Sequence, residues 1–140
     1  MEVEERLAYL AGFFDGEGCI TVNANGGITL RVINTSKPVL DLFKEILGGS
    51  IGDRTQKVNK RQYAWSAYGN TAYKILHALY PYLIEKQDQA DLALEWFNER
   101  VQYPRQKIDG RGWAAHPLRD EAIKSVRQQL TDMKMGVYAA

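Results

Sequence analysis

The sequence has little of several features that would place it in a special class of protein. Cys19 is its single cysteine, which excludes an intramolecular disulfide and a cysteine-based metal cluster. No apolar run approaches the roughly 20 residues of a membrane-spanning helix, and the acidic start of the chain does not predict a secretory signal. We therefore expect one intracellular domain over residues 1–140, in the cytoplasm, the nucleoid or an organelle matrix, with no membrane partner and no small-molecule cofactor.

An excess of charge is also missing, since the formal net charge is only +1. Proteins that bind nucleic acids usually carry a basic excess, so the total gives little support for such a partner. The charges are nevertheless unevenly spread, because basic residues gather between positions 54 and 61: Arg54, Lys57, Lys60 and Arg61. A basic segment of this kind is either a solvated loop or a contact surface for an acidic partner.

Residues 7–18 form an apolar segment that ends in two acidic residues, Asp15 and Glu17. On a helix its small residues share one face at four-residue spacing: Ala8, Gly12 and Gly16. Such a face lets another helix backbone approach closely. Carboxylates at a helix C-terminus are unfavourable, so a divalent cation bound by a carboxylate and a free carbonyl is a candidate ligand. The alternative is a core helix followed by an acidic, glycine-rich turn.

Periodicity predicts the remaining elements. Helices are expected over residues 2–14, 37–47, 72–79, 86–101 and 118–133, and strands over residues 19–25, 28–34, 50–57 and 62–68. Residues 102–117 are rich in proline, glycine and charge, and they predict a loop that is either mobile or bound to a partner.

This order predicts an α+β fold with an αββαββα core over residues 1–100, in which helices cover one face of a four-stranded, antiparallel, saddle-shaped sheet and extra helices follow. Alternation along the strands places polar side chains on the other face: Thr21, Asn23, Asn25, Thr29, Arg31, Arg54, Gln56, Gln62 and Ser66. That face is either an ordinary solvated sheet surface or a surface that reads DNA. Asn, Gln and Arg pair with adenine and guanine edges, and a β-ribbon fits the major groove.

Residues 10–18, with the sequence LAGFFDGEG, closely resemble the motif that names the LAGLIDADG homing endonucleases. Residues 32–40 are similar to the end of the family's second strand, where Asn34 matches an amide, often glutamine, that helps to place the attacking water. Residues 81–87 match the segment that carries the family's active-site lysine, here Lys86. Residues 119–136 resemble the C-terminal helix of bacterial and phage-like members, and Arg61 is the nearest candidate for a basic pocket residue.

The resemblance implies a site-specific DNA endonuclease that makes a double-strand break with short 3′ overhangs. Only one copy of the motif is present, which in this family implies a homodimer on a long pseudo-palindromic target of double-stranded DNA. The implied dimer interface consists of small and acidic residues on the motif helix: Ala8, Ala11, Gly12, Asp15 and Gly16.

The resemblance also implies the chemistry. Glu17 and the Gly16 carbonyl would bind Mg²⁺, for which Mn²⁺ or Ca²⁺ can substitute, and the catalytic residues would be Glu17, Asn34 and Lys86. The polar sheet face, together with Lys57, Lys60 and Arg61, would bind DNA. Two alternatives stay open: an intron RNA maturase or non-cleaving DNA-binding regulator on the same fold, and a structural homodimer without nucleic acid, which the near-neutral charge favours.

Overall fold

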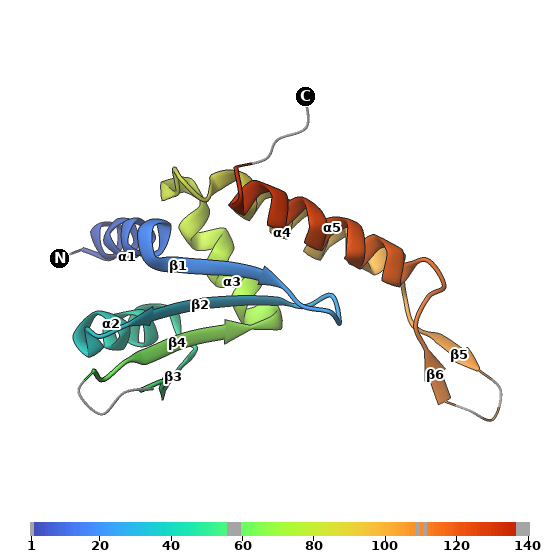
Figure 1. Cartoon of the computed structure of the whole chain (residues 1–140), viewed down its shortest axis with the longest axis horizontal. Coiled ribbons are helices and arrows are strands. Elements are labelled where there is room, and N and C mark those ends of the chain that lie inside the picture. The colour runs from blue at the N-terminus through green and yellow to red at the C-terminus, as the bar shows by residue number, and fades with distance from the viewer. Residues whose placement is uncertain (1, 56–59, 109, 111, 137–140) are drawn as a thin grey trace.

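The protein is described by a computed structural model that covers residues 2–55, 60–108, 110 and 112–136. A helix leads into a β-hairpin, a second helix leads into a second hairpin, and further helices follow (Figure 1). The helices are α1 Val3–Glu17, α2 Lys37–Leu47, α3 Gly69–Leu79, α4 Gln87–Glu99 and α5 Arg119–Lys134, with short 3-10 turns at Tyr80–Tyr82 and Arg100–Gln102. The strands are β1 Gly18–Val22, β2 Ile28–Asn34, β3 Ser50–Asp53, β4 Tyr63–Tyr68, β5 Gln106–Ile108 and β6 Gly112–Ala114.

The main sheet has the strand order β1-β2-β4-β3, and each strand is antiparallel to its neighbour. Ile20 pairs with Leu30, and Leu30 pairs with Ala67, so apolar side chains from three strands line up on one face. In Figure 1 the strands lie in front and α3 crosses behind them. The predicted α+β fold, with a four-stranded antiparallel sheet and helices on one face, is confirmed.

The main core lies between this apolar face and the helices. Phe14 on α1, Phe43 on α2 and Trp65 on β4 are fully buried in it. The rings of Phe43 and Trp65 have centroids 4.9 Å apart. The Trp65 Nε1–H donates to the Gly48 carbonyl at 2.7 Å, which ties the end of α2 to the sheet. A second cluster packs α5 onto α4 and β1, and its buried members are Val22, Trp96, Ile123, Val126 and Leu130.

Several boundaries differ from the sequence prediction for local reasons. Helix α1 continues to Glu17 instead of ending at residue 14. Strand β1 ends at Val22, because a tight turn begins where Asn23 N–H donates to the Gly27 carbonyl at 2.8 Å. Strand β3 ends at Asp53, whose carboxylate accepts the Thr55 N–H at 2.8 Å and starts a turn.

The segment predicted as a loop at residues 102–117 contains a short hairpin instead. Strands β5 and β6 pair in an antiparallel register, with Lys107 opposite Trp113. In Figure 1 this hairpin lies beyond the β1–β2 turn, next to the N-terminal end of α5. Composition indicated an irregular segment here because glycine and proline are common in it, whereas the backbone pairing gives it regular structure. In the described residues, no helix combines the length and apolar character needed to span a membrane.

Candidate functional site

Glu17 is placed by the end of α1. The chain enters β1 at Gly18, where the Phe14 ring packs against the backbone so closely that a Cβ on residue 18 would overlap the ring. Phe14 is fully buried and cannot yield, so the last glycine of the motif is required by packing. This close contact fixes Glu17 at the corner between helix and sheet, with its side chain exposed.

Glu17 opens onto a hollow of about 450 Å³ on the polar face of the sheet. The hollow is lined by side chains from α1, β1, the following turn, β2 and β4: Glu17, Cys19, Thr21, Asn23, Thr29, Arg31, Ile33 and Tyr68. A second hollow of about 210 Å³ continues it toward β3, with Arg31, Arg54, Ser66 and Tyr68 in its lining. The predicted polar face is therefore concave, and a carboxylate and two arginines open onto it.

Arg31 is held in place across the sheet. Its Nε–H donates to Ser66 Oγ at 3.2 Å, and its Nη2 lies 3.5 Å from the Tyr68 hydroxyl. The hydrogen bond of Tyr68 with Ser66, and then that with Arg31, lower the pKa of the phenol. Tyr68 itself is 54% exposed and was not predicted as a site residue. Tyr68 lies across the β2–β4 pair from Arg31, and the sequence alone does not predict the register of that pair.

Two of the residues predicted to contact DNA are covered by their neighbours. Thr29 and Ser66 are each only 7% exposed. Thr29 Oγ1 accepts the Asn23 Nδ2–H at 2.8 Å, as Ser66 does for Arg31. Both residues orient longer side chains that reach the surface, and their own contact with DNA stays a prediction. Short side chains on a concave sheet face are shaded by long ones on the adjacent strands.

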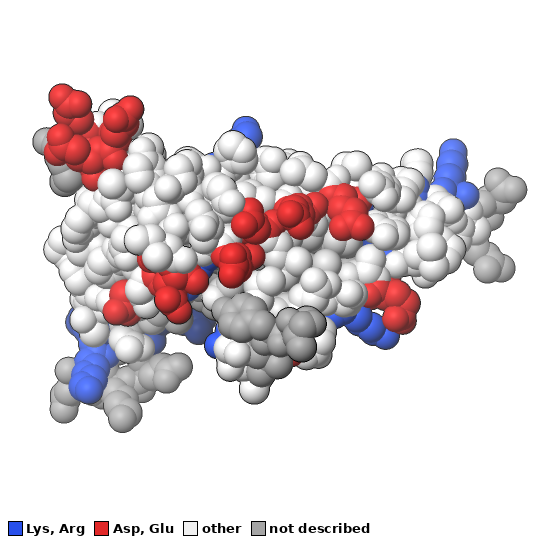
Figure 2. Space-filling view, turned by 90° about the horizontal axis from the view of Figure 1, so that it is seen from above, with Lys and Arg blue, Asp and Glu red and all other residues white. Residues whose placement is uncertain are grey.

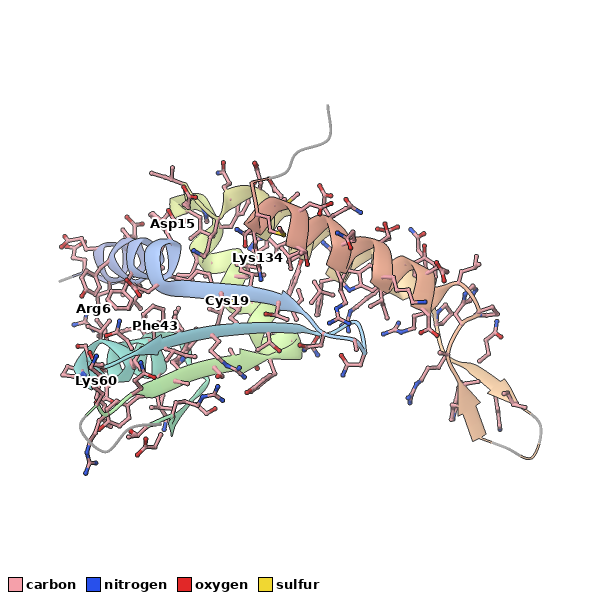
Figure 3. The ribbon with its side chains drawn as sticks, viewed as in Figure 1. Arg6, Asp15, Cys19, Phe43, Lys60 and Lys134 are labelled. Atoms are coloured by element: carbon pink, nitrogen blue, oxygen red, sulfur yellow. The ribbon has the colours of Figure 1, made fainter. Side chains whose placement is uncertain are left out.

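The other predicted surface residues differ in exposure. Asn25, Arg54, Lys60 and Arg61 are exposed, while Thr21, Arg31 and Gln62 are half-buried. Gln56 and Lys57 lie outside the described residues. Lys60 and Arg61 precede β4, and Figure 3 shows Lys60 beside α2, well away from the β1–β2 turn.

The β1–β2 turn is anchored by residues that the sequence analysis did not single out. Trp96 Nε1–H donates to the Gly26 carbonyl at 2.8 Å, and Arg119 Nη2–H donates to the Asn25 carbonyl at 3.0 Å. Arg119 also donates through Nη1 to the Tyr103 carbonyl at 3.3 Å, so it joins the turn to the base of the β5–β6 hairpin. Helices α4 and α5 thus hold the tip of the polar face.

The carboxylate of Asp15 binds the start of α4. It accepts the backbone N–H groups of Ile84, Glu85 and Lys86 at 3.0, 2.9 and 2.8 Å. Burial opposes its ionisation, but these three donors and the Lys86 charge outweigh burial and lower the pKa of Asp15. The carboxylate of Asp15 thus joins two elements of the same chain, and its place in a dimer interface stays a prediction.

Lys86 is brought to the end of α1 by the same junction. Its Nζ donates to the Asp15 carbonyl at 2.6 Å, two residues from Glu17. Sequence reasoning placed Lys86 at the start of the fourth helix, and the structure brings it to the acidic end of the first. Asn34, by contrast, has a structural contact: its Oδ1 accepts the Ser36 N–H at 2.9 Å just before α2.

The outer face of α1 is open to solvent. Ala8, Gly12 and Gly16 are exposed, and a Cβ built on either glycine would meet nothing within 4 Å among the described residues. Ala11 is different, because it is fully buried in the core of its own chain. Its predicted place in a dimer interface is corrected: four-residue spacing selects Ala8, Gly12 and Gly16, and the position before Gly12 turns inward.

The total charge is near neutral, but acidic and basic residues lie on different parts of the surface. Helix α4 has the sequence QDQADLALEWFNE, which holds four acidic residues and no basic residue. Figure 2 shows acidic side chains gathered over this helical side, with basic ones at the margins. The hollows of the sheet face instead contain Arg31 and Arg54, with Glu17 as the one acidic residue in their linings. The low net charge is therefore compatible with a sheet face that attracts anions.

The metal-binding groups at the end of α1 are few, and they suit a cation whose other ligands are water and phosphate oxygens. Among the described residues, no three His, Cys, Asp or Glu side chains gather to hold an ion. One carboxylate, that of Glu17, and the helix-end carbonyl of Gly16 are available. Mg²⁺ in proteins commonly binds one or two carboxylates and takes its other ligands from water and phosphate oxygens. The residues present fit that mode and do not fit a cage made by the protein alone.

Solved structures of similar fold are complexes of homing endonucleases with DNA. The structure is similar to the homing endonuclease I-CvuI in complex with the I-CreI target in the presence of 2 mM Mg, where the DNA is not cleaved, with 20% identity and a TM-score of 0.65 over 99% of this chain and 87% of that chain. It is similar to I-CvuI in complex with its own target in 2 mM Ca, with 20% identity and a TM-score of 0.56 over 98% of each chain. It is also similar to the archaeal intron-encoded homing endonuclease I-Vdi141I complexed with DNA, with 18% identity and a TM-score of 0.64 over 99% of this chain and 88% of that chain.

At such low identity these likenesses show a shared fold. A search of the curated proteins finds no significant match. The sequence itself matches the LAGLIDADG-like domain over residues 4–84, which is more than half of the chain and includes α1 from its second residue, Glu17 and the whole main sheet. The chain therefore belongs to the LAGLIDADG-like domain family.

Proposed function

We propose that this protein is a site-specific DNA endonuclease that cuts both strands of a long pseudo-palindromic target as a homodimer. The observation that carries the proposal is the position of Glu17. Its carboxylate stands at the end of the family's motif helix and opens onto the same concave, arginine-bearing sheet face that would hold a duplex. Because a site-specific endonuclease of this kind acts on genomic DNA, we also propose the intracellular location expected from the sequence.

The dimer is proposed from the exposed face of α1. Ala8, Gly12 and Gly16 give that face a low profile, so two copies of α1 can pack with their backbones close together. Packing about a two-fold axis continues the polar sheet face of one copy into that of the next. It also brings the two Glu17 carboxylates to the centre of the joint surface, where their repulsion favours bound cations.

DNA binding is assigned to the polar sheet face. Arg31, Asn23 and Arg54 are the longer side chains there that can donate to base edges or phosphates. The bonds from Arg31 to Ser66 and from Asn23 to Thr29 restrict their rotamers before DNA arrives, which lowers the entropy lost on binding. The anchored β1–β2 turn presents Asn25 at the end of this surface.

The chemistry is assigned to the corner between α1, α4 and β2. Glu17 and the Gly16 carbonyl would hold Mg²⁺, which when bound activates water and stabilises charge on phosphate oxygens. Lys86 keeps N–H groups beyond the one it donates to Asp15, so its ammonium group can stabilise negative charge on the cut phosphate. Asn34 keeps its Nδ2–H groups, which can donate to the oxygen of the attacking water while Oδ1 remains bound to Ser36.

The proposal is tested with a library of randomised duplexes. The protein is incubated with the library and Mg²⁺, and the ends produced are sequenced; we expect a small set of related, pseudo-palindromic sites cut with short 3′ overhangs, and no cutting in EDTA. Glu17→Gln should keep DNA binding and reduce the cleavage rate about 100-fold or more, because a metal ligand is removed. Glu121→Gln, the same change at an exposed residue of α5, is the matched control and should cut normally.

Two results would redirect the proposal. Cutting at the wild-type rate by Glu17→Gln would remove the metal assignment. Selective retention of duplexes without any cutting would favour the non-cleaving regulator, and selective retention of structured intron RNA would favour the maturase.

A further inference from the structure

A third cavity lies at the outer edge of β1, next to the hollow that contains Glu17. It has a volume of about 260 Å³ and is lined by Gly18, Cys19, Glu85, Lys86, Gln89 and Lys134. Two of these residues are lysines from elements far apart in the sequence, since Lys86 precedes α4 and Lys134 is the last residue of α5. The family motif and the resembling segments assign a role to Lys86 and none to Lys134.

Lys134 reaches the edge of the sheet next to the proposed active site. Strand β1 is an outer strand of the sheet, so the carbonyls on its free side have no strand partner. Lys134 Nζ donates to the Ile20 carbonyl at 2.6 Å and lies 3.5 Å from Cys19 Sγ. Cys19 lines both this cavity and the hollow that contains Glu17. Figure 3 shows Lys134 at the end of α5 above β1, with Cys19 below it and Asp15 beside the end of α1.

The polar side chains that line this cavity lack partners for one acceptor and for part of their positive charge. The side-chain oxygen of Gln89 is buried, and it has no hydrogen-bond partner among the described residues. Two ammonium groups line the same small space, while the one carboxylate in the lining belongs to Glu85, an exposed residue. An unpaired buried acceptor is unfavourable, and two like charges in one cavity favour an anion between them. A hydrated anion meets both needs, because its oxygens accept from the lysines and its water donates to Gln89.

We propose that Lys134, together with Lys86, binds a backbone phosphate of the DNA strand at the edge of β1. This inference rests on the proposed function, because the anion is taken to be DNA that continues from the hollow past Cys19. DNA is favoured over a free anion because the cavity adjoins the concave face through a shared residue. Lys134 would thus extend the phosphate-binding surface of the active site to the C-terminal helix, and the end of α5 would be needed for binding as well as for packing.

A purely structural role for Lys134 makes a different prediction. A lysine at the C-terminus of a helix also interacts favourably with the helix dipole, and an N–H donor to Ile20 satisfies an edge carbonyl. Lys134→Gln separates the two roles, because glutamine keeps N–H donors but removes the charge. Lys124→Gln on the same helix is the matched control, since Lys124 is highly exposed and pairs with Glu121 three residues earlier on the same helix.

The experiment measures the affinity of the full-length protein for duplex DNA retained from the randomised library in Ca²⁺, as a function of salt. For each phosphate that is no longer neutralised, the slope of log K against log salt should flatten by about 0.9, or about 1.8 for a dimer with two copies of Lys134. We expect this flattening for Lys134→Gln, restoration of the slope in Lys134→Arg, and the wild-type slope in Lys124→Gln. Thermal unfolding of each variant shows whether the fold is kept.

An unchanged slope in a folded Lys134→Gln protein would overturn the inference and leave Lys134 as an edge cap. If Lys134→Gln does not fold, Lys134→Met, which also removes the charge, is measured instead: a flattened slope supports the phosphate contact, and a wild-type slope in the folded variant contradicts it. Failure of the wild-type protein to retain any duplex would overturn the proposed function itself, so the two failures are distinguishable.

Discussion

Replacement of Asp15 by asparagine is the sharpest test of how the site is held together. The Asp15 carboxylate receives three backbone N–H groups from the start of α4, two on Oδ2 and one on Oδ1. In Asp15→Asn one oxygen remains, and the amide nitrogen that replaces the other oxygen points N–H groups at a backbone N–H. The variant therefore loses at least one hydrogen bond, loses the charge on the others, and places two donors against each other.

The expected loss of stability follows from these hydrogen bonds. A hydrogen bond to a charged group contributes about 1.5–3 kcal/mol, and a carboxylate at a helix N-terminus gains roughly 0.3–1 kcal/mol from the helix dipole. Because Asp15 is partly solvated and the neutral amide keeps some of the bonding, we expect Asp15→Asn to lower the free energy of unfolding by about 2–4 kcal/mol. That is a large part of the roughly 5–15 kcal/mol that stabilises an ordinary domain.

The assay is urea unfolding of the wild type and the variant across a range of pH. The pKa of Asp15 is below its ordinary value of 3.8 in the folded chain. Its contribution is therefore complete above the ordinary pKa and is lost as the pH falls through the lowered, folded-state pKa. The difference between wild type and Asp15→Asn should be constant near neutral pH and should shrink in strong acid.

Asp41→Asn is the matched control. It makes the same chemical change at an exposed carboxylate that pairs with Lys37, four residues earlier on α2. An exposed pair of this kind contributes about 0–1 kcal/mol, so the control should change stability little. A loss below about 0.5 kcal/mol in Asp15→Asn, comparable to the control, would refute the view that Asp15 joins α1 to α4 and positions Lys86.

Three other substitutions test separate parts of the structure. Gly12→Leu should abolish self-association in sedimentation while leaving a folded monomer, because a Cβ there meets nothing within 4 Å. Gly26→Ala should lower the free energy of unfolding by about 1–2 kcal/mol in urea, because residue 26 has φ +88° and a Cβ there would lie against Arg119 Nη2. Gly52→Ala should have a much smaller effect, because a Cβ on residue 52 would meet nothing within 4 Å and its φ is ordinary. Arg119→Gln should weaken binding to duplex DNA several-fold in fluorescence anisotropy by releasing the Asn25 carbonyl; unchanged affinity would contradict the anchoring role of α5.

Local patterns in the sequence predicted the secondary structure well where burial and periodicity agree. Strand β2 and helix α2 have the predicted bounds, because alternating or helical spacing of apolar residues is strong there and turn residues flank both. The errors lie at turns and at the ends of elements. Strands β1 and β3 end earlier than predicted because turns begin at Asn23 and Asp53, and strands β5 and β6 pair although composition favours a loop.

The sequence by itself determined the family motif, the acid at its end and the order of helices and strands, since these depend on residue type and spacing along one chain. Only the tertiary structure decided which polar side chains reach the surface. Alternation correctly placed Thr29 and Ser66 on the polar face, but Asn23 in the β1–β2 turn and Arg31 on β2 cover them. It also brought Lys86 to the end of α1 and Lys134 to the edge of β1, because packing of α4 and α5 on the sheet joins positions that no local spacing connects.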